Sequence, residues 1–228
     1  MKRIVIIILF SSLCMCMKCE DSMLPEGIET KVYGKVYDSS NDIPIVNLKL
    51  IIQELNQEPG FSLGPNIHNL GEIDSTYTDE NGDYEINFET TGRGDTYRIF
   101  SPRNNQVWQY YQNPVHIENL GSSNEINFDF LKLHPIRLII KVDNDLEFLP
   151  IRIRHLFTIN RSLTDINSTS NDIIKLIYVP LNFTTKVEFY RTKPDGQNQL
   201  FIKEIQPITD VEPVDIEIDL KNLNFEDY

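Results

Sequence analysis

Apolar and polar residues alternate with a period of two along most of this chain, and clusters of Gly, Pro, Asn and Asp separate the alternating segments. In segment 45–52, for example, Val46, Leu48, Leu50 and Ile52 share one face. Alternation of this kind predicts strands that bury one face. Strands are expected at 30–37, 45–52, 75–78, 84–88, 97–100, 107–111, 115–117, 125–133, 136–142, 151–157, 173–179, 186–191, 200–205 and 214–220.

These short strands, with no helical periodicity of useful length, predict an all-β protein. The length of 228 residues exceeds the usual size of one domain. We therefore expect two consecutive small β-sandwich domains, at 30–134 and 135–228, after a linker at 20–29. The boundary is expected near His134 and Pro135, where one strand can run straight into the next domain. The second domain is expected to be Ig-like or similar.

Turn signals and one long loop separate the strands. Asn81-Gly82 between two alternating runs is a strong hairpin signal, and it predicts a left-handed backbone conformation at Gly82. The segment also begins like a calcium loop, but Tyr84 and Thr90 stand where glycine and glutamate are required, so the hairpin is favoured. Segment 53–72 is rich in Gly, Pro and Asn and is interpreted as a long loop, a feature that is often functional.

The first residues have a different pattern from the rest. Lys2 and Arg3 precede the unbroken apolar run 4–10. This run is too short to span a bilayer, which needs about 20 apolar residues. The pattern is typical of an export signal, so we expect residues 1–19 to be a signal peptide.

All three cysteines, Cys14, Cys16 and Cys19, follow this apolar run. Disulfides that staple a secreted fold would be spread through its body, so the clustering does not fit a disulfide framework. It resembles the lipobox of bacterial lipoproteins, which implies acylation and a membrane anchor. Leu13 three positions earlier favours Cys16, although Met15 departs from the pattern; Cys19 is the rival acceptor, and Cys14 the third. We expect a cell-envelope lipoprotein, on the outer membrane.

Charge and motifs point away from several functions. The net charge is −13 and no basic patch occurs, so nucleic acid is not an expected partner. The four histidines are scattered without metal-binding spacing, and no Gly-x-Ser-x-Gly elbow occurs. We therefore expect no metal, no cofactor and no catalytic activity.

Three pieces of the first domain occur in an order that is known from one family. They are Val32-Tyr33-Gly34-Lys35-Val36-Tyr37-Asp38, then Ile43-Pro44-Ile45-Val46-Asn47-Leu48, and Thr78-Asp79-Glu80-Asn81-Gly82-Asp83-Tyr84-Glu85-Ile86. Residues 30–88 thereby resemble the carboxypeptidase regulatory-like domains, which are transthyretin-type β-sandwiches of bacterial surface proteins. Segment 53–72 departs from that pattern as an insertion. The resemblance implies a fold and a surface context, and no chemistry.

Aromatic residues supply the candidate binding site. Trp108 and Tyr110 share one strand face, as either an exposed platform for a glycan or protein ligand or simply core mass. Phe61 and His68 in segment 53–72 are further candidates. The expected function is therefore a non-catalytic binding or accessory module. The alternative is a structural spacer or adhesin-like subunit that pairs through edge strands. Arg93-Gly94-Asp95 spells an adhesion tripeptide, but such residues are common in turns.

Overall fold

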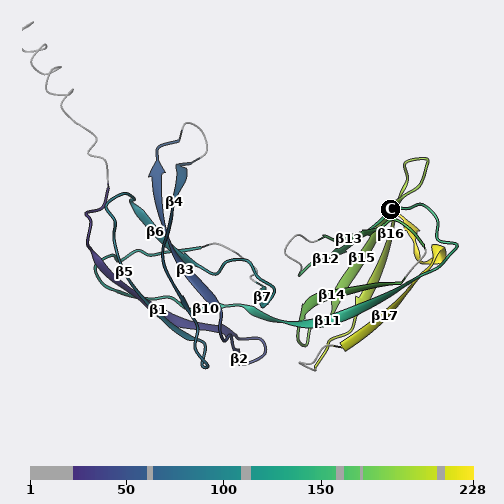
Figure 1. Cartoon of the computed structure of the whole chain (residues 1–228), viewed down its shortest axis with the longest axis horizontal. Helices are drawn as coiled ribbons and strands as arrows, with labels where there is room; N and C mark the ends of the chain where they lie inside the picture. Colours follow the sequence, from purple (N-terminus) through teal and green to yellow (C-terminus); the bar gives the residue numbers. More distant parts are fainter. Residues whose placement is uncertain (1–22, 61–63, 109–113, 158–161, 170–171, 210–213) are drawn as a thin grey trace, which may run out of the picture.

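The computed structural model of the chain describes residues 23–60, 64–108, 114–157, 162–169, 172–209 and 214–228. These residues form two β-sandwiches in succession, which confirms the all-β class (Figure 1). The one helix in this described part is a short 3-10 turn at Asn222–Asn224. None of the helical structure in these ranges is long and apolar enough to cross a membrane.

The first sandwich packs two sheets face to face. In one, β1 (Glu29–Asp38) pairs antiparallel with β2 (Ile43–Pro44) and β5 (Asp83–Glu89), and parallel with β9 (Ser123–Glu125) and β10 (Phe128–Asp129). The other has the order β4 (Asn66–Tyr77), β3 (Lys49–Glu58), β6 (Thr96–Phe100) and β8 (Val115–His116). Their facing side chains form one core, which includes Val32, Val36, Leu48, Leu50, Ile52, Tyr84, Ile86, Phe88, Tyr97 and Ile99.

Gly34 allows the segment between β9 and β10 to approach β1 closely. A Cβ at this position would lie 2.0 Å from the carbonyl oxygen of Ile126, in the segment between β9 and β10. Tyr33 accepts the hydrogen bond of the Ile126 N–H, at 2.8 Å. Only glycine therefore allows this segment to lie against β1.

The second sandwich has the same two-layer plan. One sheet has the order β14 (Ile173–Pro180), β11 (Leu131–Val142) and β17 (Val214–Leu220). The other has the order β13 (Ser162–Ile166), β12 (Ile151–His155), β15 (Thr185–Thr192), β16 (Asn198–Ile205) and β18 (Glu226–Asp227). The core between them includes Ile136, Leu138, Ile140, Ile151, Ile153, Ile177, Val187, Phe189, Ile218 and Leu220.

A single strand joins the two sandwiches. The first residues of β11 pair with β7 (Val107–Trp108), and the rest of β11 pairs with β14 and β17 of the second sandwich (Figure 1). Two further contacts flank the strand. The side-chain amide of Asn182 donates to Asn41 at 2.9 Å, and the rings of Trp108 and Phe157 stack edge to face at 5.4 Å. Because β11 is continuous through His134 and Pro135, the exact domain boundary stays a prediction.

The predicted loop at 53–72 is wrong. β3 continues to Glu58 and β4 begins at Asn66, so the segment forms a hairpin that projects from the sandwich (Figure 1). The pattern concealed this hairpin because β4 is an edge strand with mostly exposed residues, and two register shifts interrupt its pairing with β3. Val46, expected inside, is also exposed because the chain turns at Asn47, where φ is +55°.

The turn at Gly82 is confirmed, with a φ of +78°, but it does not close a paired hairpin. β5 pairs with β1, whereas β4 pairs with β3 in the facing sheet. The turn therefore carries the chain from one layer of the sandwich to the other. A carboxylate oxygen of Asp79 accepts hydrogen bonds from the N–H groups of Asn81 and Asp83, at 2.8 and 2.9 Å.

Candidate functional site

The outer face of the first sheet combines lysine and tyrosine with carboxylates. Strand alternation turns Val32 and Val36 of β1 into the core, so Lys31, Tyr33, Lys35 and Tyr37 point outward. The neighbouring strands carry the carboxylates. Tyr33 lies opposite Glu85 of β5 and Glu125 of β9, Lys35 lies opposite Asp83, and Tyr37 lies opposite Asp129.

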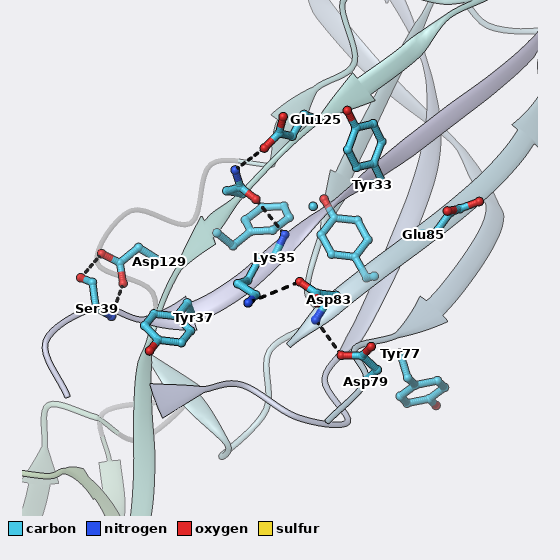
Figure 2. A pocket seen from close by; sticks show the side chains of 14 residues that line it. Tyr33, Lys35, Tyr37, Ser39, Tyr77, Asp79, Asp83, Glu85, Glu125 and Asp129 are labelled. Atoms are coloured by element: carbon cyan, nitrogen blue, oxygen red, sulfur yellow. Dashed lines mark hydrogen bonds and ion pairs between the residues drawn. The ribbon is translucent and has the colours of Figure 1, made fainter. Parts of the chain in front are cut away.

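This face forms an open groove of about 1130 Å³. Figure 2 shows its labelled side chains, which come from β1, β5, β9, β10, the end of β4 and the turns beside these strands. We call this site the tyrosine groove. Its lining comprises Tyr33, Gly34, Lys35, Tyr37, Ser39, Tyr77, Asp79, Asp83, Tyr84, Glu85, Glu125, Asn127, Phe128 and Asp129.

Two lysines of β1 bind carboxylates and tyrosine rings together. The Lys31 ammonium lies 2.8 Å from Glu85 and 5.6 Å from the centroid of the Tyr33 ring. The Lys35 ammonium lies 3.6 Å from Asp83 and 5.9 Å from the centroid of the Tyr37 ring. The hydrogen bond from Lys31 also holds the pKa of the Glu85 carboxyl below its usual value.

Hydrogen bonds fix the two ends of the groove. The Ser39 backbone N–H and hydroxyl both donate to the Asp129 carboxylate (Figure 2). The Tyr37 hydroxyl donates to Asp42, and this bond raises the pKa of Tyr37. Tyr77 and Asp79 form the opposite end, where Tyr77 is 56% exposed.

The chemistry of this lining suits binding. Tyrosine rings present flat apolar faces, and carboxylates accept strong hydrogen bonds from hydroxyl or ammonium donors. The lining contains no histidine or cysteine, and its one serine hydroxyl donates to Asp129. Among the residues that the structure describes, no group of three or more His, Cys, Asp or Glu side chains could hold a metal ion.

Of the site residues predicted from the sequence, the two that the structure describes, Trp108 and His68, do not line this groove. Cys16, Cys19, Phe61 and Tyr110 lie outside the described residues. Trp108 is half-buried at the junction of the sandwiches, against Phe157. His68 lies on the projecting hairpin, 3.5 Å from Glu58. Their role in ligand binding stays a prediction, and the structure gives no common site for Trp108 and His68.

The tripeptide Arg93-Gly94-Asp95 is engaged within the fold. Arg93 and the Gly94 N–H both donate to Glu54, at 2.9 and 3.1 Å. The Asp95 carboxylate accepts from the Gln57 N–H at 3.1 Å. A Cβ on Gly94 would lie 2.5 Å from the Leu55 carbonyl oxygen. These contacts explain the tripeptide as the anchor of the loop before β6.

Sequence reasoning missed the tyrosine groove, although part of its signal was present. Tyr33, Lys35 and Tyr37 lie two residues apart on a strand that was correctly predicted, so they necessarily share a face. The signal did not include Glu125 and Asp129, because their pairing with β1 is long-range in the sequence.

Comparisons with known proteins do not place the chain in a family. No family model and no curated protein matches it. Solved structures that resemble it include the Bacillus anthracis TIE protein (15% identity, TM-score 0.34, covering 85% of this chain and 34% of that one). They also include shaft pilin SpaA from Lactobacillus rhamnosus GG (9% identity, TM-score 0.32, covering 87% of this chain and 99% of that one). A streptococcal ancillary pilin is a further one (14% identity, TM-score 0.35, covering 86% of this chain and 63% of that one). The chain thus spans about a third of the TIE protein, and TM-scores this low support no conclusion about function.

Proposed function

We propose that this protein is an exported, lipid-anchored and non-catalytic binding module of the cell envelope, and that its tyrosine groove holds a saccharide. Acylation at Cys16 or Cys19 would provide the anchor, and labelled palmitate should enter the wild type but not a variant with all three cysteines replaced by alanine. The motifs of residues 30–88 support placing the first sandwich among carboxypeptidase regulatory-like domains.

The observation that carries the proposal is the arrangement around Tyr33. Tyr33 is 37% exposed and lies between Glu85 and Glu125 on the neighbouring strands. A sugar ring has an apolar C–H face and a rim of hydroxyl groups. An aromatic ring flanked by carboxylates matches both features, because the ring packs on the face and the carboxylates accept the hydroxyl hydrogens.

Removal of the Tyr33 ring should therefore weaken saccharide binding. We expect Tyr33→Ala to lower the affinity for any saccharide that the wild type binds on a glycan array by at least about 10-fold, the order of magnitude by which nucleic-acid binding falls when a stacking aromatic is removed. The measurement uses the full chain purified in detergent. Tyr228→Ala is the control, because Tyr228 is 62% exposed on the second sandwich, outside the groove. Equal affinity of Tyr33→Ala and wild type, or an empty array, would contradict the proposal.

One observation favours a second function, assembly through an edge strand. Among the described strands β14 pairs with β11 alone, over eight residues without a register shift. Its outward residues Ile174 and Leu176 are 63% and 51% exposed. Natural edge strands are usually protected by charges, prolines or bulges, as β4 is by its two register shifts. β14 has only Lys175 and the terminal Pro180, so a second copy could add its own β14 there in a two-fold arrangement.

This second function predicts self-association that depends on Leu176. The full chain in detergent should sediment as a dimer at micromolar concentration. Leu176→Lys should shift it to the monomer, because the two copies would then bring like charges together on the outer face of the joined sheet. Ile202→Lys is the control for a charge added at an exposed apolar position away from β14, since Ile202 is 40% exposed on β16 of the other sheet. A wild type that sediments as a monomer throughout would exclude pairing of this kind.

A further inference from the structure

The tyrosine groove already binds ammonium groups that belong to the protein itself. Lys31 lies against Glu85 and the Tyr33 ring, and Lys35 lies against Asp83 and the Tyr37 ring. An ammonium group near an aromatic face is attracted by the negative face of the ring, and a neighbouring carboxylate adds to the attraction. The same combination of ring and carboxylate occurs twice more in the groove.

In these two places the carboxylate has no cationic partner among the residues that the structure describes, although Lys31 already lies near the Tyr33 ring. Tyr77 lies beside Asp79 at one end of the groove, and Glu125 lies next to Tyr33 on the side away from Glu85 (Figure 2). Within the described ranges no lysine or arginine forms an ion pair with Asp79 or Glu125, and no cation lies over the Tyr77 ring.

Among the described residues, the hydrogen-bond donors to these carboxylates are neutral. Asp79 accepts from backbone N–H groups, Glu125 accepts from the side-chain amide of Asn127, and Asp129 accepts from Ser39. These three carboxylates are therefore held in place, and no described residue of the chain neutralises their charge.

The charge of the lining selects among saccharides. It contains five carboxylates, Asp79, Asp83, Glu85, Glu125 and Asp129, and one ammonium group, Lys35. Lys31, beside the lining, pairs with Glu85, so three negative charges remain in excess. This excess repels uronic, sulfated or phosphorylated sugars and attracts a ligand with positive charge. A neutral saccharide would gain only the ring and hydroxyl contacts.

We propose that the groove binds a saccharide with free amino groups, and that Asp79, Glu125 and Asp129 hold its ammonium groups as Glu85 and Asp83 hold those of Lys31 and Lys35. This inference rests on the proposed function, since it names the class of saccharide that the same groove takes. It also gives the exposed Tyr77 ring a role as the third aromatic contact of the ligand.

The test compares two probes of equal length, a glucosamine hexasaccharide and its N-acetylated counterpart, by titration calorimetry at pH 6 with the full chain in detergent. At this pH the primary amines are protonated, whereas acetylation removes the charge. We expect the glucosamine probe to bind at least about 10-fold tighter, and its affinity to fall as salt is raised from 50 to 500 mM because ions screen the contacts.

Charge-neutral variants locate the ammonium groups. Asp79→Asn keeps an oxygen that can accept from Asn81 and Asp83 but loses the charge. With Glu125→Gln and Asp129→Asn added, the preference for the glucosamine probe should fall to about twofold or less. Asp195→Asn is the matched control, because Asp195 caps the equivalent turn of the second sandwich through the Gln197 N–H. Unchanged melting temperatures show that the variants remain folded.

The outcomes separate the two proposals. Equal affinity for both probes, or a preference that survives the triple variant, would overturn the assignment of an amino saccharide while saccharide binding in the groove stands. If the protein binds other glycans on the array but neither probe, the assignment of an amino saccharide is overturned and the proposed function stands. Failure to bind any glycan at all would overturn the proposed function as well.

Discussion

Replacement of Glu54 by alanine should lower the free energy of unfolding of the first sandwich by about 3 kcal/mol or more. The Glu54 side chain is fully buried, and it accepts hydrogen bonds from Thr91, Tyr97 and the Gly94 N–H in addition to its ion pair with Arg93. Alanine would leave these donors without their acceptor inside the protein. Chemical denaturation followed by circular dichroism at pH 7 measures the effect.

Two variants control this prediction. Glu54→Gln keeps an acceptor oxygen without the charge and should cost less than alanine, since hydrogen bonds to a charged acceptor are the stronger kind. Glu72→Ala removes an exposed carboxylate that lies 3.9 Å from Lys49, and it should change stability by less than about 1 kcal/mol. If Glu54→Ala unfolds at the same denaturant concentration as Glu72→Ala, the network around Glu54 does not stabilise the sandwich.

The same network makes stability depend on acid. Burial raises the pKa of Glu54, but the hydrogen bonds from Thr91 and Tyr97 and the Arg93 charge outweigh it, so the pKa lies below the ordinary value of 4.5. The folded state therefore binds this proton less readily than the unfolded state. The contribution of Glu54 is fully present above pH 4.5 and is lost as the pH falls through the lowered pKa. Glu54→Gln should remove this part of the acid dependence.

The sequence was most informative where a strand has one buried and one exposed face. β1, β5 and β15 bury alternate residues, so their pattern predicted them nearly to the residue. β4 escaped prediction because it is an exposed edge strand, whose two faces are both mostly in contact with water. Alternation reports burial, and an edge strand of this kind buries too little to show it.

Long-range pairing accounts for what the sequence could not show of the groove. The outward residues of β1 follow from alternation alone, but Asp129 binds Ser39 from 90 residues further along the chain. That contact depends on the parallel pairing of β1 with β10. No local pattern encodes it. The candidate ligand residues in segment 53–72 were chosen from a local pattern alone. That pattern was interpreted as a loop, whereas the segment forms a hairpin of β3 and β4.

Replacement of Gly82 by valine should destabilise the first sandwich more than the same change in an equivalent turn of the second. Gly82 and Gly196 have φ angles of +78° and +89°, and each N–H donates to the carbonyl three residues earlier. A side chain in this conformation costs roughly 1–2 kcal/mol at either position. The turns differ in their surroundings, because a Cβ on Gly82 would lie 2.4 Å from the Val36 carbonyl oxygen, whereas Gly196 has nothing within 4 Å.

The difference between the two variants therefore isolates the steric contact. Val36 cannot withdraw easily, since its N–H donates to the Gly82 carbonyl at 2.8 Å and its carbonyl accepts from Ile45 at 3.1 Å. We expect Gly196→Val to lower the melting temperature by several degrees, as about 1 kcal/mol implies for a domain of this size, and Gly82→Val to lower it by at least twice as much. Equal decreases would show that β1 shifts without cost, and that the turn between the two layers is not held against it.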